Sequence, residues 1–189
     1  MRKEIIFTGF GGQGIILMGV IIARMMEHFP ELQVTQAQSY GPASRGGACR
    51  TDVVISDQQI NYHKSSRPDV MVFMSEEALK RLLSEADPAR TLVVYDNTLI
   101  KTIPAPYTAT FAVPATGQAE KEFKNRMVAN IFMLGAVIEL INPGSFDVLK
   151  QIVASSVPKK FEELNIKALE AGHEYYQKHK PKQNPPPSK

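Results

Sequence analysis

The sequence predicts a single α/β domain, in which helices flank a mostly parallel β-sheet. Short β-branched runs alternate with helical patterns along the chain, and this alternation is typical of βαβ units. The length of 189 residues is that of one domain, and the chain shows neither an internal repeat nor a linker that would divide it. A domain of this size buries about 70% of its unfolded surface, so disulfides and structural metals are not needed for folding.

The predicted strands are short apolar runs bounded by glycine, proline or polar turn residues. The first run leads directly into a glycine-rich turn, and the third and fourth are expected to pair with each other around a turn at residues 56–58. The expected strands cover residues 4–8, 32–37, 48–55, 59–61, 70–74, 91–95 and 107–113.

The predicted helices carry apolar residues at helical spacing and have recognisable ends. Ser75 and Ser145 are expected to be N-caps, because each stands directly before a helical pattern. The most apolar helix follows Pro114 and is expected to lie in the core or in an interface. The expected helices cover residues 14–29, 76–86, 127–140, 146–155 and 160–178.

The composition excludes several classes of protein. Hydrophobic residues make up 43% of the chain and charged residues 22%, as in globular proteins and unlike disordered or collagen-like chains. The formal net charge of +3 is largely a property of the last twelve residues, which carry four lysines and no acid. The nearly neutral remainder does not indicate nucleic-acid binding, which usually requires basic residues clustered on a folded face. We expect a domain at residues 1–178 and a flexible, disordered Lys/Pro tail at residues 179–189.

No segment predicts export or a membrane location. The N-terminus passes straight into the first strand without a signal-peptide core. No apolar run approaches the ~20 residues of a spanning helix. The sequence therefore predicts a cytoplasmic protein.

The strongest motif is the turn Gly-Phe-Gly-Gly-Gln-Gly, whose candidate binding residues are Gly9, Gly11, Gly12, Gln13 and Gly14. It satisfies G-x-G-x-x-G between a strand and a helix, and in a Rossmann-like fold such a turn lets the backbone approach a phosphate. The acid that binds the ribose of a dinucleotide is missing, because the second strand ends in Gln-Ala-Gln-Ser. A phosphate-bearing ligand, dinucleotide chemistry and a purely structural turn are the three interpretations.

A second candidate is the loop at residues 39–50, Ser-Tyr-Gly-Pro-Ala-Ser-Arg-Gly-Gly-Ala-Cys-Arg. We expect it to leave the second strand at the same sheet edge as the glycine turn, where ligands bind in doubly wound folds. Arg45 carries a planar guanidinium suited to a phosphate or carboxylate. Tyr40 and Gly46 join it as candidate binding residues, and Arg50 adds local positive charge.

The alternative interpretation of this loop is structural. In that case Arg45 pairs with an acid, such as Asp52 or Asp96, and holds the loop or a subunit interface. The residues alone favour neither interpretation.

Catalytic and metal-binding patterns do not stand out. The single cysteine, Cys49, cannot form a Cys-based cluster unaided, and we expect a buried, inert thiol. The four histidines show no metal-ligand spacing, and no nucleophile–base pairing is visible. They are His28, His63, His173 and His179. The sequence predicts no catalytic residue and no metal ligand.

The two motifs together resemble the gamma subunit of 2-oxoacid:ferredoxin (acceptor) oxidoreductases: the turn at residues 9–14 and Tyr-Gly-Pro-Ala-Ser-Arg-Gly-Gly at residues 40–47. The stretch at residues 125–135 is similar to the same family, and the resemblance covers about residues 3–178. Separate gamma chains of this length resemble the 2-oxoglutarate enzyme most. Pyruvate and branched-chain 2-oxoacid enzymes are alternatives, as is an independent Rossmann-type dinucleotide-binding protein.

The resemblance implies a division of labour between subunits. The whole enzyme converts a 2-oxoacid and coenzyme A to acyl-CoA, CO2 and a reduced ferredoxin-like acceptor. Thiamine diphosphate, Mg2+ and iron–sulfur clusters are expected on alpha, beta and delta partners. This chain is expected to be inactive alone and to serve assembly, with coenzyme A as its candidate ligand and Arg45 and the glycine turn near the phosphates.

Overall fold

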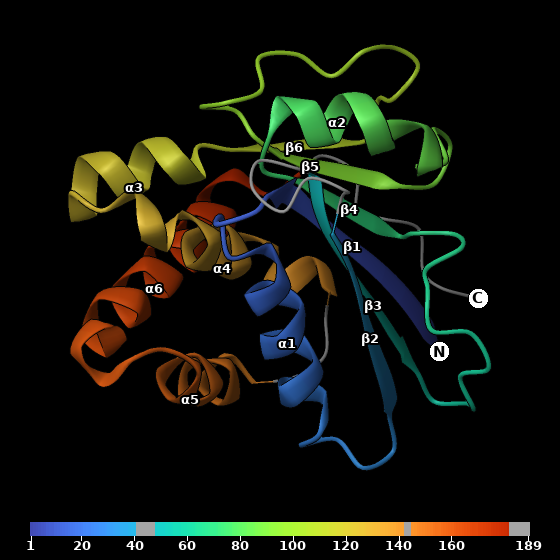
Figure 1. Cartoon of the computed structure of the whole chain (residues 1–189), viewed down its shortest axis with the longest axis horizontal. Coiled ribbons are helices and arrows are strands. Elements are labelled where there is room, and N and C mark those ends of the chain that lie inside the picture. Colours follow the sequence, from blue (N-terminus) through green and yellow to red (C-terminus); the bar gives the residue numbers. More distant parts are fainter. Residues whose placement is uncertain (41–47, 142–144, 182–189) are drawn as a thin grey trace.

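The sheet that organises the molecule has six strands in the described residues, 1–40, 48–141 and 145–181 of a computed structural model (Figure 1). The strands are β1 (Arg2–Phe10), β2 (Gln33–Tyr40), β3 (Ala48–Ser56), β4 (Val70–Phe73), β5 (Leu92–Asp96) and β6 (Thr110–Val113). Their order is β2-β3-β1-β4-β5-β6. Only β3 runs against the others, so the prediction of a mostly parallel sheet is confirmed.

The helices form two unequal layers. They are α1 (Ile15–Met26), α2 (Glu76–Leu82), α3 (Ala115–Phe123), α4 (Ala129–Ile141), α5 (Phe146–Ser156) and α6 (Glu162–His179). Short 3-10 turns add η1 (Leu83–Glu85), η2 (Arg126–Val128) and η3 (Lys159–Phe161). Figure 1 shows α2 over one face of the sheet and α1, α4, α5 and α6 on the other side. None of the helices in the described residues is long and apolar enough to cross a membrane.

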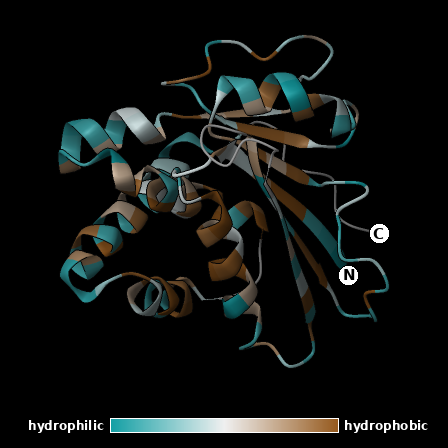
Figure 2. Cartoon of the chain, viewed as in Figure 1, coloured by the Kyte–Doolittle hydropathy of each residue, from teal (hydrophilic) through white to brown (hydrophobic). Residues whose placement is uncertain are grey.

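The core follows from the alternation of side chains along the strands. In β1, Ile5 and Phe7 join the larger apolar cluster beneath α1 and α4, whereas Ile6 joins the smaller one beneath α2. Figure 2 shows the same pattern as hydrophobic colour along the central strands and on α1. The central strands are therefore buried on both faces, as their continuous apolar runs predict.

The predicted strand at residues 59–61 is wrong. These residues are not in a strand, and β3 pairs instead with β1 on one side and with β2 on the other. Because both edges of β3 are hydrogen-bonded along their length, neither is left for a strand after the turn. The side-chain oxygen of Gln33 accepts a hydrogen bond from the N–H of Ile60 at 3.3 Å.

The predicted helix starts are confirmed at both serines. The Ser75 hydroxyl accepts the N–H of Ala78 at 3.1 Å, and the Ser145 hydroxyl accepts the N–H of Asp147 at 3.2 Å. At the other end of the chain, α6 ends at His179. Residues 182–189 lie outside the described residues, so the predicted flexible tail stays a prediction.

Candidate functional site

The glycine turn and the second candidate loop leave the sheet at the same edge. Gly9 in β1 pairs with Cys49 in β3, and Cys49 pairs with Tyr40 at the end of β2. The ends of β1 and β2 are therefore two strand spacings apart, about 10 Å. The expectation that both loops share an edge is confirmed. Residues 41–47, which include Arg45 and Gly46, lie outside the described residues.

Two glycines of the turn are required by the backbone or by packing. Gly12 has φ +98° and Gly14 has φ +72°, both in the left-handed region that favours glycine. A Cβ on Gly14 would also collide with the side-chain amide of Asn130 in α4. Gly11 differs, because a Cβ there would meet no atom of the described residues within 4 Å. Gly12 likewise has no such neighbour among the described residues, so this part of the structure leaves the turn open at Gly11 and Gly12.

The side chain of Gln13 is used to hold the turn. Its Oε1 accepts the N–H of Phe10 at 2.6 Å, and its Nε2 donates to the carbonyl oxygen of Met74 at 2.8 Å. These bonds close the turn onto the end of β4. The structure therefore places the Gln13 side chain in a supporting role, and only its backbone remains a candidate for contact with a ligand.

A small pocket of about 100 Å³ opens beside the turn, between Gly12, Gln13, Met74 and the start of α3 and η2. Arg126 in η2 lines this pocket, with its Nε 3.8 Å from a carboxylate oxygen of Glu120. Its side chain is 59% exposed, so its charge faces solvent beside the glycine turn. Sequence reasoning did not select Arg126 as a binding residue, although it lies in the stretch that resembled the family.

Asp96 holds Thr116, which lines the small pocket, in place. It is fully buried at the end of β5, and it accepts hydrogen bonds from the N–H of Thr98 at 3.0 Å and from Thr116. The Thr116 hydroxyl donates to the same carboxylate at 2.6 Å. Asp96 therefore anchors the first turn of α3, and its carboxylate already has three donors. Residue 45 lies outside the described residues, so the alternative pairing of Asp96 with Arg45 stays a prediction.

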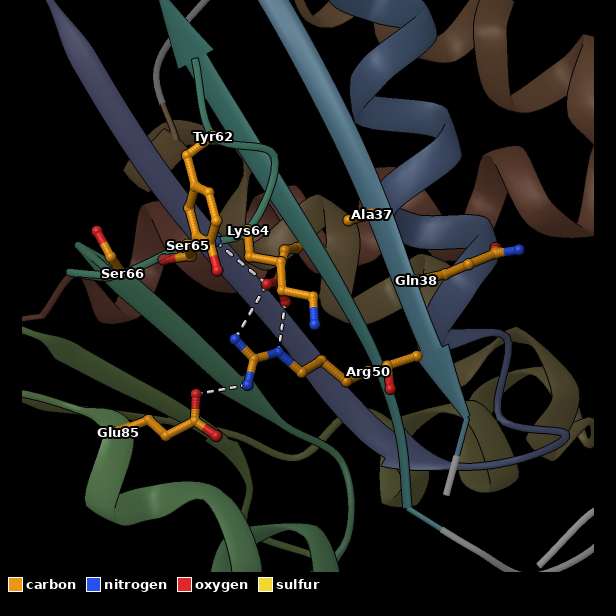
Figure 3. Close-up of a pocket in the computed structure, with 10 residues that line it drawn as sticks. Ala37, Gln38, Arg50, Tyr62, Lys64, Ser65, Ser66 and Glu85 are labelled. Atoms are coloured by element: carbon orange, nitrogen blue, oxygen red, sulfur yellow. Dashed lines mark hydrogen bonds and ion pairs between the residues drawn. The ribbon is translucent and has the colours of Figure 1, made fainter. Parts of the chain in front are cut away.

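A polar pocket of about 340 Å³ lies on the α2 side of β2 and β3 (Figure 3). Arg50 donates to both carboxylate oxygens of buried Asp52, at 2.5 and 3.0 Å, and to Glu85 at 2.5 Å. Burial alone would lower the pKa of Arg50, but these two acids hold it above its ordinary value. The positive charge that the sequence placed at Arg50 is thus neutralised within the fold. Figure 3 shows Tyr62 and Lys64 on the opposite wall.

Cys49 lies between Gly9 and Tyr40 in the sheet and is 4% exposed. Burial raises the pKa of its thiol, which disfavours the reactive thiolate. The prediction of a buried cysteine is confirmed. Within the described ranges, no three His, Cys, Asp or Glu side chains are arranged to hold a metal ion.

Comparison with known proteins places this geometry in a family. Residues 4–175 match the pyruvate ferredoxin/flavodoxin oxidoreductase family. A 2-oxoglutarate synthase subunit KorC from Methanothermobacter marburgensis is 39% identical over 179 residues, which cover 92% of this chain and 96% of the relative.

Two solved structures share the fold. The gamma subunit of a keto/oxoacid ferredoxin oxidoreductase from Geobacter sulfurreducens matches with a TM-score of 0.83 at 34% identity, over 95% of this chain and 98% of that chain. A 2-oxoglutarate:ferredoxin oxidoreductase from Magnetococcus marinus, solved with 2-oxoglutarate, coenzyme A and succinyl-CoA bound, matches with a TM-score of 0.81 at 25% identity. That match covers 97% of this chain and 33% of the longer one.

The match spans the glycine turn, the end of β2 and the stretch around Arg126. The edge of the sheet brings the turn and the end of β2 together, and the small pocket joins the turn to Arg126. The chain belongs to the pyruvate ferredoxin/flavodoxin oxidoreductase family, as a gamma-type subunit of a 2-oxoacid:ferredoxin oxidoreductase.

Proposed function

We propose that this chain is the non-catalytic gamma subunit of a 2-oxoglutarate:ferredoxin oxidoreductase and lies next to its coenzyme A. The relative from Methanothermobacter marburgensis, at 39% identity, supports 2-oxoglutarate as the substrate of the complex. Alpha, beta and delta subunits carry the thiamine diphosphate, Mg2+ and iron–sulfur clusters in this proposal. Pyruvate and branched-chain 2-oxoacids are the alternative substrates.

The observation that carries the proposal is the open glycine turn at the N-terminus of α1. None of the described residues would contact a Cβ at Gly11 or Gly12, and the positive end of a twelve-residue helix favours an anion there. Arg126 adds an exposed cation at the same turn. These groups suit the phosphates of coenzyme A, and the bound coenzyme A of the Magnetococcus marinus enzyme supports that ligand. Arg45, Tyr40 and Gly46 complete the proposed site from the loop after β2.

The internal hydrogen bonds of the polar side chains at this edge support the proposed non-catalytic role. Gln13, Asp96 and Thr116 are each bonded within the fold. Gln13 has no titratable group and the Asp96 carboxylate is fully buried, so neither side chain is placed to exchange a proton with a substrate. The proposed work of this chain is therefore to position coenzyme A and to hold partner subunits.

Co-purification tests the assignment to a complex. A tagged chain, purified from its native cells, is expected to bring down thiamine- and cluster-bearing subunits. The assembled enzyme is expected to reduce ferredoxin fastest with 2-oxoglutarate, compared with pyruvate and 2-oxoisovalerate. Recovery of a lone chain that NAD(H) protects against thermal unfolding, while coenzyme A does not, would favour an independent dinucleotide-binding protein and overturn the proposal.

Substitution of the cations tests the coenzyme A site. In the assembled enzyme, Arg45→Ala and Arg126→Ala are each expected to raise the KM for coenzyme A about tenfold, with the KM for the 2-oxoacid unchanged. Arg81→Ala, which changes an exposed arginine on α2 that does not line the pocket beside the turn, is the control and should behave as wild type. An unchanged KM for coenzyme A in both test variants would contradict the phosphate assignment.

A further inference from the structure

The edge of the sheet formed by β2 is long and open. β2 lies at one end of the strand order, so only β3 pairs with it, and its other side meets no strand in the described residues (Figure 1). In an antiparallel strand, alternate residues direct their N–H and C=O groups away from the neighbouring strand. Among the described residues, no backbone group outside β3 forms a hydrogen bond with β2. About half of the backbone groups of this eight-residue strand are therefore available to another chain.

β2 lacks the features that usually protect a free edge from pairing with another chain. Its sequence, Gln-Val-Thr-Gln-Ala-Gln-Ser-Tyr, contains neither proline nor a charged residue. Its pairing with β3 proceeds one residue at a time from Gln33 to Tyr40, so no bulge bends the strand away. The opposite edge differs, because β6 has four residues and Pro114 follows it. β2 is thus the edge that is ready for pairing with a further strand.

An unbonded hydroxyl lies on this edge strand. The Oγ1 of Thr35 is buried and has no hydrogen-bond partner in the described part of the chain. Ser39 follows four residues later in the same strand, so the two side chains lie on the same face of β2. A buried hydroxyl without a partner is costly, and a polar side chain on an adjoining strand would remove that cost.

We propose that β2 pairs with β2 of a second copy of this chain, in an antiparallel register centred on Ala37. The two sheets then form one continuous sheet across a twofold axis, and each contact away from the axis occurs twice. The absence of charge on β2 favours a second copy, because a charged strand that met its own copy would bring like charges together. This inference concerns the assembly of the chain and does not depend on the proposed coenzyme A site.

The register follows from the faces of β2. Residues that lie opposite one another in a strand pair point to the same face of the sheet. Centring the pair on Ala37 places Thr35 opposite Ser39 of the second copy, with Cβ atoms about 5 Å apart, so the Thr35 hydroxyl gains a partner. Centring the pair on Gln36 would instead place Thr35 opposite Ala37, whose side chain has no polar atom. The unbonded hydroxyl therefore favours the register centred on Ala37.

A second pair of side chains supports the same register, which places Gln36 opposite Gln38 of the second copy. The Nε2 of Gln36 donates to the hydroxyl of Thr51 at 2.7 Å, which leaves the Oε1 of Gln36 for the side-chain amide of Gln38. Gln38 is exposed, and Figure 3 shows its side chain pointing away from Arg50. Both faces of β2 thus offer a polar pair to a second copy.

Charges at the centre of the pair test the second copy. Analytical ultracentrifugation of the purified full chain is expected to show a dimer. Ala37→Lys and Ala37→Glu each bring two like charges together, so each should raise the dimer dissociation constant at least about tenfold. An equal mixture of the two variants brings opposite charges together, and its constant should return to within about threefold of wild type. Gln151→Lys, at an exposed position of α5, is the control and should leave the constant unchanged.

Cross-linking tests the register, both in the chain alone and in the assembled enzyme. In the proposed register, the Cα atoms at position 37 of the two copies are about 5 Å apart, within the span of a disulfide. Those at position 36 are diagonal neighbours about 7–8 Å apart, which is beyond that span. Mild oxidation should therefore link Ala37→Cys to its copy and leave Gln36→Cys unlinked. The native Cys49 is 4% exposed and is kept in both variants.

Four results would overturn the proposal. A full chain that stays monomeric at every concentration would exclude the second copy. A dimer whose dissociation constant responds to neither charged variant would lie on another surface. Failure of the folded charged variants and of their mixture to assemble with partner subunits would assign β2 to a strand of such a subunit. Cross-linking of Gln36→Cys in place of Ala37→Cys would contradict the register. Circular dichroism checks the folding of each variant, and cross-linking of Ala37→Cys decides the matter if the charged variants do not fold.

Discussion

Single residues of the glycine turn have different tasks that the motif G-x-G-x-x-G does not separate. The sequence identified the turn and its place between a strand and a helix correctly. It could not distinguish Gly14, whose Cβ would collide with Asn130, from Gly11, whose Cβ would contact none of the described residues. It also could not reveal that the Gln13 side chain reaches Met74, because that contact joins two strands that are neighbours only in the folded sheet.

We expect alanine to separate these glycines. Gly14→Ala should lower the free energy of unfolding by about 2–4 kcal/mol, because it combines a left-handed φ with a collision at Asn130. Gly11→Ala should stay within about 1 kcal/mol of wild type, since its Cβ would contact none of the described residues. Urea unfolding of both variants measures the difference. Equal losses of unfolding free energy would show that folding requires glycine at both positions, and would contradict this distinction.

The buried carboxylate of Glu4 gives the fold a dependence on pH. Burial alone would raise the pKa of Glu4, but hydrogen bonds from the N–H groups of Arg67 and Ser66, the Arg2 side chain and the Ser65 hydroxyl outweigh it. The pKa therefore lies below its ordinary value of 4.5. Because the folded-state pKa is lower than the unfolded one, this stabilisation is complete above the unfolded pKa. It is lost as the pH falls through the folded pKa.

Replacement of this carboxyl should therefore matter at neutral pH and not in acid. Glu4→Gln is expected to lower the free energy of unfolding at pH 7 by about 1–3 kcal/mol, because charged hydrogen bonds are lost. The difference from wild type should shrink as the pH falls below 4.5, the ordinary value. Urea titrations at several pH values check this, with exposed Glu163→Gln as the control. A difference that does not depend on pH would contradict the assignment.

At the scale of elements, helices were easier to predict than strand pairing. Helix starts at Ser75 and Ser145 depend on residues three positions apart or fewer, and the sequence contains that information. The partners of β3 are set by distant segments, and periodicity alone cannot assign them. Periodicity also predicted helices at the positions of α4 and α6, but it could not predict that these two helices pack closely against each other.

Two glycines let α4 and α6 touch at the backbone. A Cβ on Gly172 would collide with the carbonyl oxygen of Phe132, and one on Gly135 would collide with that of Leu169. Backbone atoms cannot move aside as a flexible side chain can. Both glycines are therefore required by packing, in helices whose φ angles any residue adopts.

Gly172→Ala is expected to separate the two helices. The free energy of unfolding should fall by about 2–4 kcal/mol, even though alanine is the better helix former by about 1 kcal/mol. Thermal unfolding followed by circular dichroism measures the loss, and Gly11→Ala serves as a control for the addition of a methyl group. A Gly172→Ala variant that is more stable than wild type would mean that the gain in helix propensity exceeds the cost of the collision with Phe132, and that the helices are not in close contact.

At the scale of the whole molecule, the sequence predicted positive charge from Arg50 at the sheet edge that carries the glycine turn. In the fold, the exposed positive charge at this edge comes from a different arginine. Arg126 remains exposed at the glycine turn, whereas Arg50 is bound by Asp52 and Glu85. The sequence could not separate the two arginines, because Glu85 approaches Arg50 only when α2 and η1 pack over the sheet (Figure 3). Arg50 thus joins the β2–β3 part of the sheet to the α2 layer.

Asp52 is buried and Glu85 is exposed, so we expect the loss of either ion pair with Arg50 to change the free energy of unfolding by different amounts. Arg50→Ala would leave Asp52, which is 2% exposed, with the N–H of Ser65 at 3.2 Å as its remaining described donor. An uncompensated buried charge costs about 3–5 kcal/mol, so we expect a loss of that size in the free energy of unfolding. Glu85→Ala removes an exposed partner and should cost about 0–1 kcal/mol. The double variant Arg50→Met/Asp52→Leu should recover most of the loss, because it removes both buried charges together. Urea unfolding of the three variants measures these differences, and equal losses in Arg50→Ala and Glu85→Ala would mean that Asp52 is solvated rather than buried.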